Sequence, residues 1–246
     1  MRTHLILFLI PYYLLSQNYS PPTYVIVHGA WGGGWAFKEV DHLMTERKAK
    51  VYRPTLSGLG EKAHLLSENI NLETHINDII NVILYEELDE IILVGHSYGG
   101  MVITGVSDSI PKKIKKMIYL DAFVPMDNES VFSISLISPP SDKDKAKGAL
   151  IPSWVDKNSM PPKDVPHPLK TFSNEISLNN KDREKIPTTY ILTVKKGASP
   201  DQDDFAFHSK RASDKGWEVK YFESDHNPQW SEPKKLTELL ILIGQD

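Results

Sequence analysis

The sequence predicts an α/β fold: a mostly parallel sheet with helices on its faces and an inserted lid. From Tyr24 onwards, short apolar runs alternate with longer segments of helical period, which is typical of βα units and a parallel sheet. The alternation stops between residues 125 and 186, where prolines recur too often for long helices or central strands. The 246 residues suffice for one sizeable core and are too few for two ordinary catalytic domains.

The elements expected before residue 125 follow this alternation in order. The apolar run 24–27 predicts a buried strand, and the helix expected over 35–48 places Phe37, Val40 and Leu43 on one face. The same patterns predict a short strand over 51–53, a helix over 72–88, a strand over 90–94, a helix from Gly99 to Ser107 and a strand over 117–120.

We name residues 125–186 the lid segment and expect short pieces of chain that lie over the sheet. Regular elements are expected again after it, and Ser231 is placed to cap the last helix with its hydroxyl. Residues 18–246 are therefore predicted to form one domain that carries the lid segment as an insertion. The expected elements are a strand over 189–194, a helix over 203–215, a strand over 217–222 and a helix over 232–243.

The first 17 residues have the pattern of a secretory signal peptide. Arg2 and His4 precede an apolar run over residues 5–15, and polar residues follow it. The run is too short to cross a bilayer as a helix, so no integral membrane span is expected in the mature chain. These features predict export to the periplasm or the medium. The alternatives are an N-terminal strand or a misplaced start codon, and a cytoplasmic protein.

Composition excludes several classes of function. A formal net charge of −4 gives no reason to expect a nucleic-acid partner, and the basic run over 111–116 is interpreted as a solvated helix end or loop. The absence of cysteine excludes disulfides, thiolate nucleophiles and cysteine zinc sites. No His-x-x-x-His pair or spaced acid cluster with histidine is present, so we expect no metal and no cofactor.

A Gly-x-Ser-x-Gly motif runs from Gly95 to Gly99, directly after an apolar strand and directly before a helical segment. The turn between such a strand and helix is so tight that only glycines fit beside a strained serine. The hydroxyl of Ser97 is then exposed at the carboxyl edge of the sheet. This context predicts that Ser97 is a nucleophile rather than an idle serine in a tight turn.

A serine hydroxyl needs a base to take its proton at neutral pH. His226 lies in the loop after the last predicted strand and is the histidine that fits the chain order serine, acid, histidine. His28 and His96 flank the two loops of the site and are expected to hold backbone geometry. The other histidines are expected to be packed or exposed: His42, His64, His75, His167 and His208.

The acid that orients the imidazole is open between two places in the chain. Asp121 follows a strand beside the serine turn, and a buried carboxylate there needs a partner because unpaired burial is costly. It is the preferred candidate. The alternatives follow the strand over 189–194 and are Asp201, Asp203 and Asp204, which also suit a helix start.

The glycine-rich loop over 28–34 is expected to face the reacting carbonyl. Acyl transfer builds negative charge on the carbonyl oxygen, which preorganised N–H groups stabilise. The amides of Ala30 and Tyr98 are the expected donors. A phosphate-binding loop is disfavoured, because neither Gly-x-Gly-x-x-Gly nor a Gly-Lys-Ser/Thr ending is present. Nearby aromatic residues are expected to line a pocket or pack in the core: Trp31, Trp35, Tyr98, Phe123 and Trp154.

Three motifs together resemble small bacterial α/β-hydrolases, which are similar to plant methylesterases and hydroxynitrile lyases. They are the stretches 28–35, 54–60 and 95–100, within a likeness that runs from Tyr24 to Glu232. The resemblance implies an α/β-hydrolase fold with a lid, Ser97 as nucleophile and His226 as base. At the acid the chain departs from the plant enzymes, because 195–197 reads Lys-Lys-Gly where they carry an aspartate.

Residues 119–122 resemble haloalkane dehalogenases, in which the acid can follow the strand after the nucleophile helix. The serine nucleophile means that dehalogenation itself is not implied. Asn227 stands where the hydroxynitrile lyases have a lysine, which disfavours lyase chemistry. The sequence therefore predicts a serine hydrolase that cleaves a small-molecule carboxylic ester through an acyl-enzyme. The alternatives are a C–C lyase of the hydroxynitrile type and a non-catalytic ligand receptor on the same fold.

Overall fold

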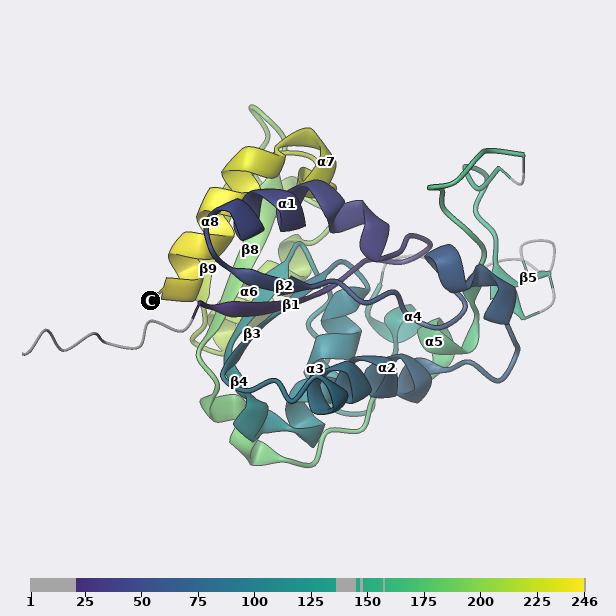
Figure 1. The fold of residues 1–246 in the computed structure, drawn as a ribbon, viewed down its shortest axis with the longest axis horizontal. Helices are drawn as coiled ribbons and strands as arrows, with labels where there is room; N and C mark the ends of the chain where they lie inside the picture. Colours follow the sequence, from purple (N-terminus) through teal and green to yellow (C-terminus); the bar gives the residue numbers. More distant parts are fainter. Residues whose placement is uncertain (1–20, 136–144, 147, 157, 246) are drawn as a thin grey trace, which may run out of the picture.

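A six-stranded, fully parallel sheet forms the centre of the protein in the computed structural model, which describes residues 21–135, 145–146, 148–156 and 158–245 (Figure 1). The strand order is β2-β1-β3-β4-β8-β9. This confirms the α/β fold with a mostly parallel sheet. The strands are β1 (Thr23–Val27), β2 (Lys50–Tyr52), β3 (Ile91–His96), β4 (Ile114–Leu120), β8 (Thr188–Val194) and β9 (Glu218–Glu223).

Helices cover both faces of this sheet, and each face has its own apolar core (Figure 1). Side chains alternate along β1, so that Tyr24 and Ile26 belong to one core and Val25 and Val27 to the other. The first core packs under α1 (Lys38–Glu46) and α8 (Pro233–Gln245). The second packs under α2 (Leu72–Tyr85), α3 (Gly99–Ser109) and α6 (Ala206–Asp214).

Most predicted elements are present, with ends that differ by a few residues. Strand β3 continues through Gly95 and His96 up to the serine turn, and β4 begins at Ile114, three residues earlier than expected. The helix expected over 35–48 divides into a 3₁₀ turn, η1 (Gly34–Phe37), and α1. The start of α2 is fixed by a capping box between Asn71 and Thr74. Short 3₁₀ turns η2 (Gly60–Leu65), η3 (Pro111–Lys113) and η6 (Pro200–Gln202) complete the connections.

The sequence suggested that the basic run over 111–116 is a solvated helix end or loop, and this is only partly correct. Its second half belongs to β4, where Lys116 is 9% exposed and its Nζ donates to the carbonyl oxygen of Ile243 at 2.7 Å. The aliphatic stem of the lysine is buried while its ammonium group satisfies a carbonyl near the end of α8. This contact joins the sheet to the C-terminal helix.

Ser231 does not cap the last helix, contrary to the prediction. It ends a short helix, α7 (Pro228–Ser231), and its hydroxyl contacts Ser224 and Asp225. The carbonyl of Glu232 accepts from the N–H of Leu236 instead, so Glu232 precedes the first turn of α8. Proline at the start of both α7 and α8 explains why the chain forms two helices here.

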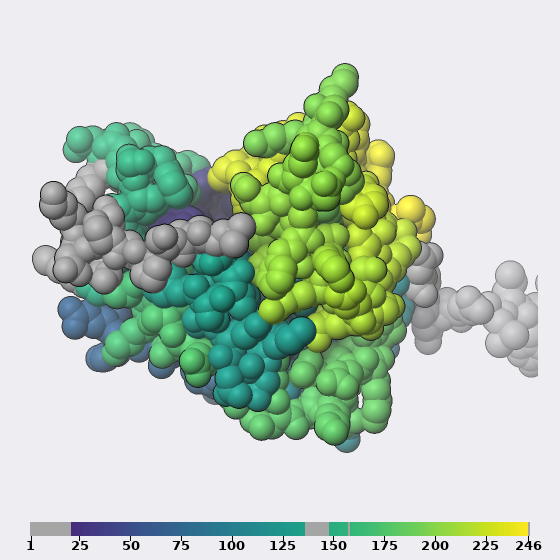
Figure 2. All heavy atoms as spheres, turned by 180° about the vertical axis from the view of Figure 1, so that it is seen from behind, coloured from purple at the N-terminus to yellow at the C-terminus, as the bar shows by residue number. Residues whose placement is uncertain are grey.

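Described parts of the lid segment contain only short elements. An antiparallel sheet of three two-residue strands is formed by β5 (Lys145–Ala146), β6 (Ala149–Leu150) and β7 (His167–Pro168). The helices are α4 (Val131–Ile134), α5 (Lys170–Ser173) and the 3₁₀ turn η5 (Lys181–Lys185). Figure 2 shows the molecule hollowed between this segment, in teal-green, and the light green to yellow C-terminal part.

The predicted signal peptide lies outside the described residues, so export stays a prediction. Within residues 21–135, 145–146, 148–156 and 158–245, no helix is both long and apolar enough to cross a membrane.

Candidate active site

The turn from β3 into α3 presents Ser97 in a strained backbone conformation, with φ at +53°. The glycines around it are required by space. A Cβ on Gly95 would lie 2.8 Å from the carbonyl oxygen of Gly99, and a Cβ on Gly99 would lie 2.5 Å from that of Val27. A Cβ on Gly100 would overlap the carbonyl oxygen of Phe123. The Gly-x-Ser-x-Gly motif therefore forms the tight strand-to-helix turn that its sequence context predicted.

His226 reaches the serine from the loop after β9. Its Nε2 lies 3.0 Å from the Oγ of Ser97, and its Nδ1 lies 2.6 Å from Oδ2 of Asp121. The ring of Phe205 stacks on the imidazole with centroids 4.9 Å apart. The imidazole is thus held at both nitrogens and on one face. The structure brings together the three side chains that the sequence proposed as nucleophile, base and acid.

Asp121 is fully buried directly after β4, with its backbone in the left-handed region at φ +44°. Its Oδ1 accepts the N–H of Thr193 at 3.1 Å, and its own N–H donates to the carbonyl of Ile191 at 2.7 Å. Both partners belong to β8. The neighbouring strand therefore satisfies one carboxylate oxygen and fixes the backbone, while the other oxygen faces His226.

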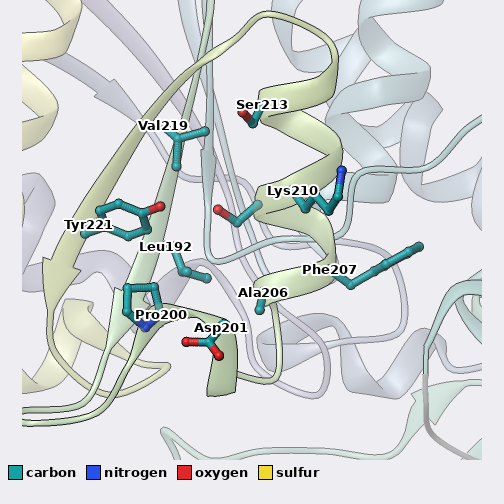
Figure 3. A pocket seen from close by; sticks show the side chains of 10 residues that line it. Leu192, Pro200, Asp201, Ala206, Phe207, Lys210, Ser213, Val219 and Tyr221 are labelled. Atoms are coloured by element: carbon teal, nitrogen blue, oxygen red, sulfur yellow. The ribbon is translucent and has the colours of Figure 1, made fainter.

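The three alternative acids make other contacts. Asp203 accepts the N–H of Phe205 at 2.9 Å, and burial raises the pKa of its carboxyl group. Asp201 accepts a hydrogen bond from the hydroxyl of Ser199 and lines a groove of about 590 Å³ between α6 and β9 (Figure 3). Asp204 is exposed. Of the four candidates, Asp121 alone has a hydrogen bond to His226 among the described residues.

Ala30 and Tyr98 lie in the two loops that meet at Ser97. Within the described part of the chain, neither backbone N–H has a hydrogen-bond acceptor. Gly29 lets these loops approach closely, since a Cβ there would lie 3.2 Å from the Cβ of Ser97. Backbone N–H groups without a protein acceptor, in loops that meet at a serine, are suited to stabilise an oxyanion.

Histidines around the serine are buried and neutral. Burial lowers the pKa of His28 to about 4, that of His75 to about 4 and that of His96 to about 3. His28 accepts the N–H of Leu56 at Nε2 and contacts the carbonyl of Gly29 at Nδ1, which joins two loops of the site. The expectation that His28 holds backbone geometry is confirmed. His96 does the same for the His226 loop, with Nε2 2.8 Å from the His226 carbonyl oxygen.

The sequence of this chain also matches a known protein family. A model of the Alpha/beta hydrolase family matches residues 24–239. The chain belongs to this family. An α/β-hydrolase fold was what the three sequence motifs implied, and the strand order and serine turn of the hydrolase agree with it.

Relatives of this hydrolase include esterases. It is 36% identical to a carbendazim hydrolyzing esterase of Nocardioides sp. (strain SG-4G), over 90% of this chain and 99% of that protein. It is 23% identical to methylesterase 2 of Arabidopsis thaliana, over 94% and 99% of the two chains. Some plant methylesterases are longer, and the hydrolase spans 56% of one of them.

Solved structures show the same fold. An extracellular alpha/beta-hydrolase from a Paenibacillus species superposes with a TM-score of 0.73 and 24% sequence identity, over 92% of this chain and all of that one. This likeness concerns the fold, because sequence identity at this level carries no specific activity.

Aromatic residues near the serine divide into core and surface. Tyr98 is fully buried and stacks on Phe172 with centroids 5.4 Å apart, and Phe123 is 7% exposed. Trp35 stacks on Trp230. Trp31 and Trp154 meet edge to face at 5.2 Å, and Trp154 is 61% exposed. Core packing thus accounts for Tyr98 and Phe123, while the two tryptophans of the lid side keep exposed surface.

Metal-binding clusters are absent from the described residues, where no group of three or more His, Cys, Asp or Glu side chains is suitably arranged. Sequence reasoning did not identify the roles of Thr193, Phe205 and His167. Thr193 contacts Asp121, Phe205 contacts His226 and His167 contacts Trp31. The two residues of each pair lie far apart along the chain, and such contacts leave no local pattern in the sequence.

Proposed function

We propose that the hydrolase cleaves small carboxylic esters through an acyl-enzyme, with Ser97 as nucleophile, His226 as general base and Asp121 as the orienting acid. The esterase relatives support ester cleavage by a serine hydrolase. The observation that carries the assignment of residues is the hydrogen-bonded series from Ser97 Oγ through both nitrogens of His226 to Asp121.

In the first step, the Oγ of Ser97 attacks the ester carbonyl while Nε2 of His226 takes its proton. The bond from the carbonyl carbon to the alkoxy oxygen then breaks, and the same proton passes from His226 to the leaving alcohol. In the second half, water attacks the acyl carbon while Nε2 of His226 takes its proton. The bond from the acyl carbon to Oγ then breaks, the proton passes from His226 to Oγ of Ser97, and the carboxylic acid leaves. Asp121 stays ionised and holds the tautomer in which Nδ1 carries hydrogen.

The developing oxyanion is stabilised by the N–H groups of Ala30 and Tyr98. Both donors are backbone groups fixed before substrate arrives, so no reorganisation is needed as charge develops. Loss of one such donor costs about 10²–10³-fold in kcat in serine hydrolases. No cofactor takes part in this scheme.

The substrate class is a carboxylic ester with a small alcohol group. Methylesterase and carbendazim hydrolyzing esterase are the names of relatives, which makes methyl esters and carbendazim suitable test compounds beside p-nitrophenyl esters. The lyase and receptor alternatives are not favoured by these relatives. Asn227 in place of the lyases' lysine also weighs against lyase chemistry.

The deciding experiment measures hydrolysis of p-nitrophenyl acetate and butyrate by the wild type, Ser97→Ala and Asp121→Asn. We expect turnover in the wild type, none above background in Ser97→Ala, and a loss of about 10⁴-fold in kcat in Asp121→Asn. Asp203→Asn and Asp201→Asn are matched controls, since each neutralises a nearby carboxylate that has no hydrogen bond to His226.

Full activity in Asp121→Asn together with loss in Asp203→Asn would reject Asp121 as the acid. Wild-type enzyme with no turnover of the p-nitrophenyl esters, methyl esters or carbendazim, and no labelling of Ser97 by a fluorophosphonate, would reject the function itself. Cyanide release from a cyanohydrin without ester turnover would favour the lyase.

A further inference from the structure

Trp31 directly follows Ala30, and its backbone is held in an unfavourable conformation. Its φ is +62°, a region that favours glycine and is unusual for a bulky side chain. Such a conformation is strained and persists only where neighbouring groups restrain it. The position of the Ala30 N–H therefore depends on what restrains Trp31.

One restraint is local, because the N–H of Gly32 donates to the carbonyl oxygen of Ala30 at 2.7 Å, and the others come from the lid segment. The N–H of Trp31 donates to Nδ1 of His167 at 3.1 Å, and its carbonyl accepts the N–H of Val165 at 2.9 Å. The indole Nε1 donates to the carbonyl of Leu150 at 3.3 Å. Each of these partners lies more than 100 residues away along the chain. The lid segment thus contacts Trp31 through both backbone groups and the side chain.

His167 can accept this hydrogen bond only as a neutral ring with its hydrogen on Nε2. The Nε2 group contacts Oγ1 of Thr171 at 2.8 Å, and that hydroxyl donates onward to the carbonyl of Pro168. Thr171 is therefore the acceptor, which assigns the ring hydrogen to Nε2 and leaves the Nδ1 lone pair for Trp31. The ring is fully buried, and burial holds the pKa of His167 well below its usual range.

The same ring contacts the second oxyanion residue. His167 meets Tyr98 with ring centroids 4.9 Å apart, and the hydroxyl of Tyr98 contacts Nδ1 of His75 at 2.9 Å. His75 in turn contacts the carbonyl of Ser57 through Nε2, so its Nδ1 accepts from Tyr98. One imidazole of the lid segment therefore contacts Tyr98 itself and Trp31, the residue that follows Ala30.

We propose that His167 is a positioning residue of the oxyanion hole: it accepts the N–H of Trp31 and so fixes the Ala30 amide beside Ser97. This inference rests on the proposed ester hydrolysis and extends it to the lid segment. His167 does not touch the reacting atoms. Its removal is expected to weaken stabilisation of the transition state while substrate binding in the ground state changes little.

The test compares His167→Leu with His167→Asn. Leucine removes the acceptor, whereas the amide oxygen of asparagine can accept the Trp31 N–H near the position of Nδ1. We expect kcat to fall about 10- to 100-fold in His167→Leu, because misplacement by about 1 Å costs up to about 10²-fold. KM is expected to stay within about threefold, and His167→Asn to recover most of kcat.

A second readout reports on the oxyanion hole directly. An aryl trifluoromethyl ketone adds to Ser97 and places a tetrahedral oxyanion between the two amides. Its inhibition constant should rise in His167→Leu by the same factor as kcat/KM falls, since both depend on the same donors. A fluorophosphonate should still label the full amount of His167→Leu protein, although more slowly.

His208→Leu is the matched control for loss of a buried imidazole. His208 is 3% exposed and its Nδ1 also accepts a backbone N–H, that of Val124, but it has no contact with Trp31. We expect a similar fall in melting temperature and a change in kcat of less than threefold. Unchanged kcat in His167→Leu, or a loss that asparagine does not restore, overturns the inference alone. Absence of wild-type turnover and of Ser97 labelling overturns the proposed function and the inference with it.

Discussion

The Nε2 of His96 lies 2.8 Å from the backbone carbonyl oxygen of His226, the residue whose side chain faces the serine. His96 precedes Ser97 in the chain, so the serine turn itself holds the loop that carries the imidazole. The centroids of the two imidazole rings are 4.9 Å apart. The backbone of His226 is therefore held in part by a residue that the proposed mechanism does not use.

Replacement of His96 should loosen that loop. We expect His96→Leu to lower kcat for p-nitrophenyl acetate about 10- to 100-fold, because the donor to the His226 carbonyl is lost and the imidazole is free to shift. His96→Gln keeps an N–H at a similar distance and should retain more activity. Steady-state kinetics measures both, with the exposed His64→Gln as control. Equal activity in the leucine and glutamine variants contradicts this role.

Two glycines of α3 should respond differently to alanine. A Cβ on Gly100 meets the backbone oxygen of Phe123, which cannot move without disrupting the serine turn. A Cβ on Gly105 meets the Cδ1 and Cγ1 atoms of the buried Ile76 side chain, which can shift at a lower cost than backbone. Both substitutions gain about 1 kcal/mol of helix propensity. We expect Gly100→Ala to lower the melting temperature and activity severely and Gly105→Ala to change both much less, as thermal unfolding and turnover would measure.

Buried neutral histidines make stability dependent on pH. Burial lowers the folded-state pKa of His28, His75 and His208 to about 4, while the same groups titrate near 6.5 when unfolded. Between these values the unfolded state binds more protons, so the free energy of unfolding falls as pH falls from about 6.5 towards 4. Each pKa unit corresponds to about 1.4 kcal/mol per group.

Urea unfolding at pH 7.5, 6 and 5 measures this dependence. We expect the midpoint to drop steadily below pH 6.5, and the drop to be smaller in His208→Asn, which removes one of the buried imidazoles. His42→Gln, at an exposed side chain, is the matched control for removal of a histidine. A midpoint that is constant down to pH 5 contradicts the burial of neutral rings.

An ion pair joins α6 to the chain after β4. Arg211 donates to both carboxylate oxygens of Glu129 and to the carbonyl of Val124 at 3.1 Å, and the two side chains are 14% and 21% exposed. Arg211→Met leaves the carboxylate without its partner and should destabilise the fold by about 2 kcal/mol. The exposed pair of Lys210 and Asp214 is the control, and Lys210→Met should cost less than about 0.5 kcal/mol. Chemical unfolding of both variants measures the difference.

Ser97 and His226 could be proposed from sequence because their evidence is local or follows chain order. The motif around Ser97 needs only a strand before it and a helix after it, and His226 needs only to follow the last strand. Asp121 was harder, since which of two loops meets an imidazole is decided by tertiary packing. The burial argument favoured it, and the structure adds the Thr193 amide, which no pattern in the sequence announces.

The lid segment shows where sequence reasoning ends. Its prolines predicted short elements, and its described parts contain short elements, but the contacts of Trp31 with Leu150, Val165 and His167 depend on how those pieces fold. Lys116 is a smaller case of the same kind. A run of lysines is interpreted as solvated because each charge is costly to bury. The Nζ of Lys116 donates to the carbonyl oxygen of Ile243, 127 residues away, and this hydrogen bond offsets that cost.

With Asp121 after β4 as the proposed acid, the loop after β8 has no role in the proposed mechanism. Lys195, Lys196 and Gly197 are exposed, and no atom outside the adjacent residues lies within 4 Å of where a Gly197 Cβ would be. This loop is therefore a suitable place to graft a peptide, an affinity tag or a second protein domain. The hydrolase could be tethered to a support there with its hydroxyl, imidazole and carboxylate undisturbed.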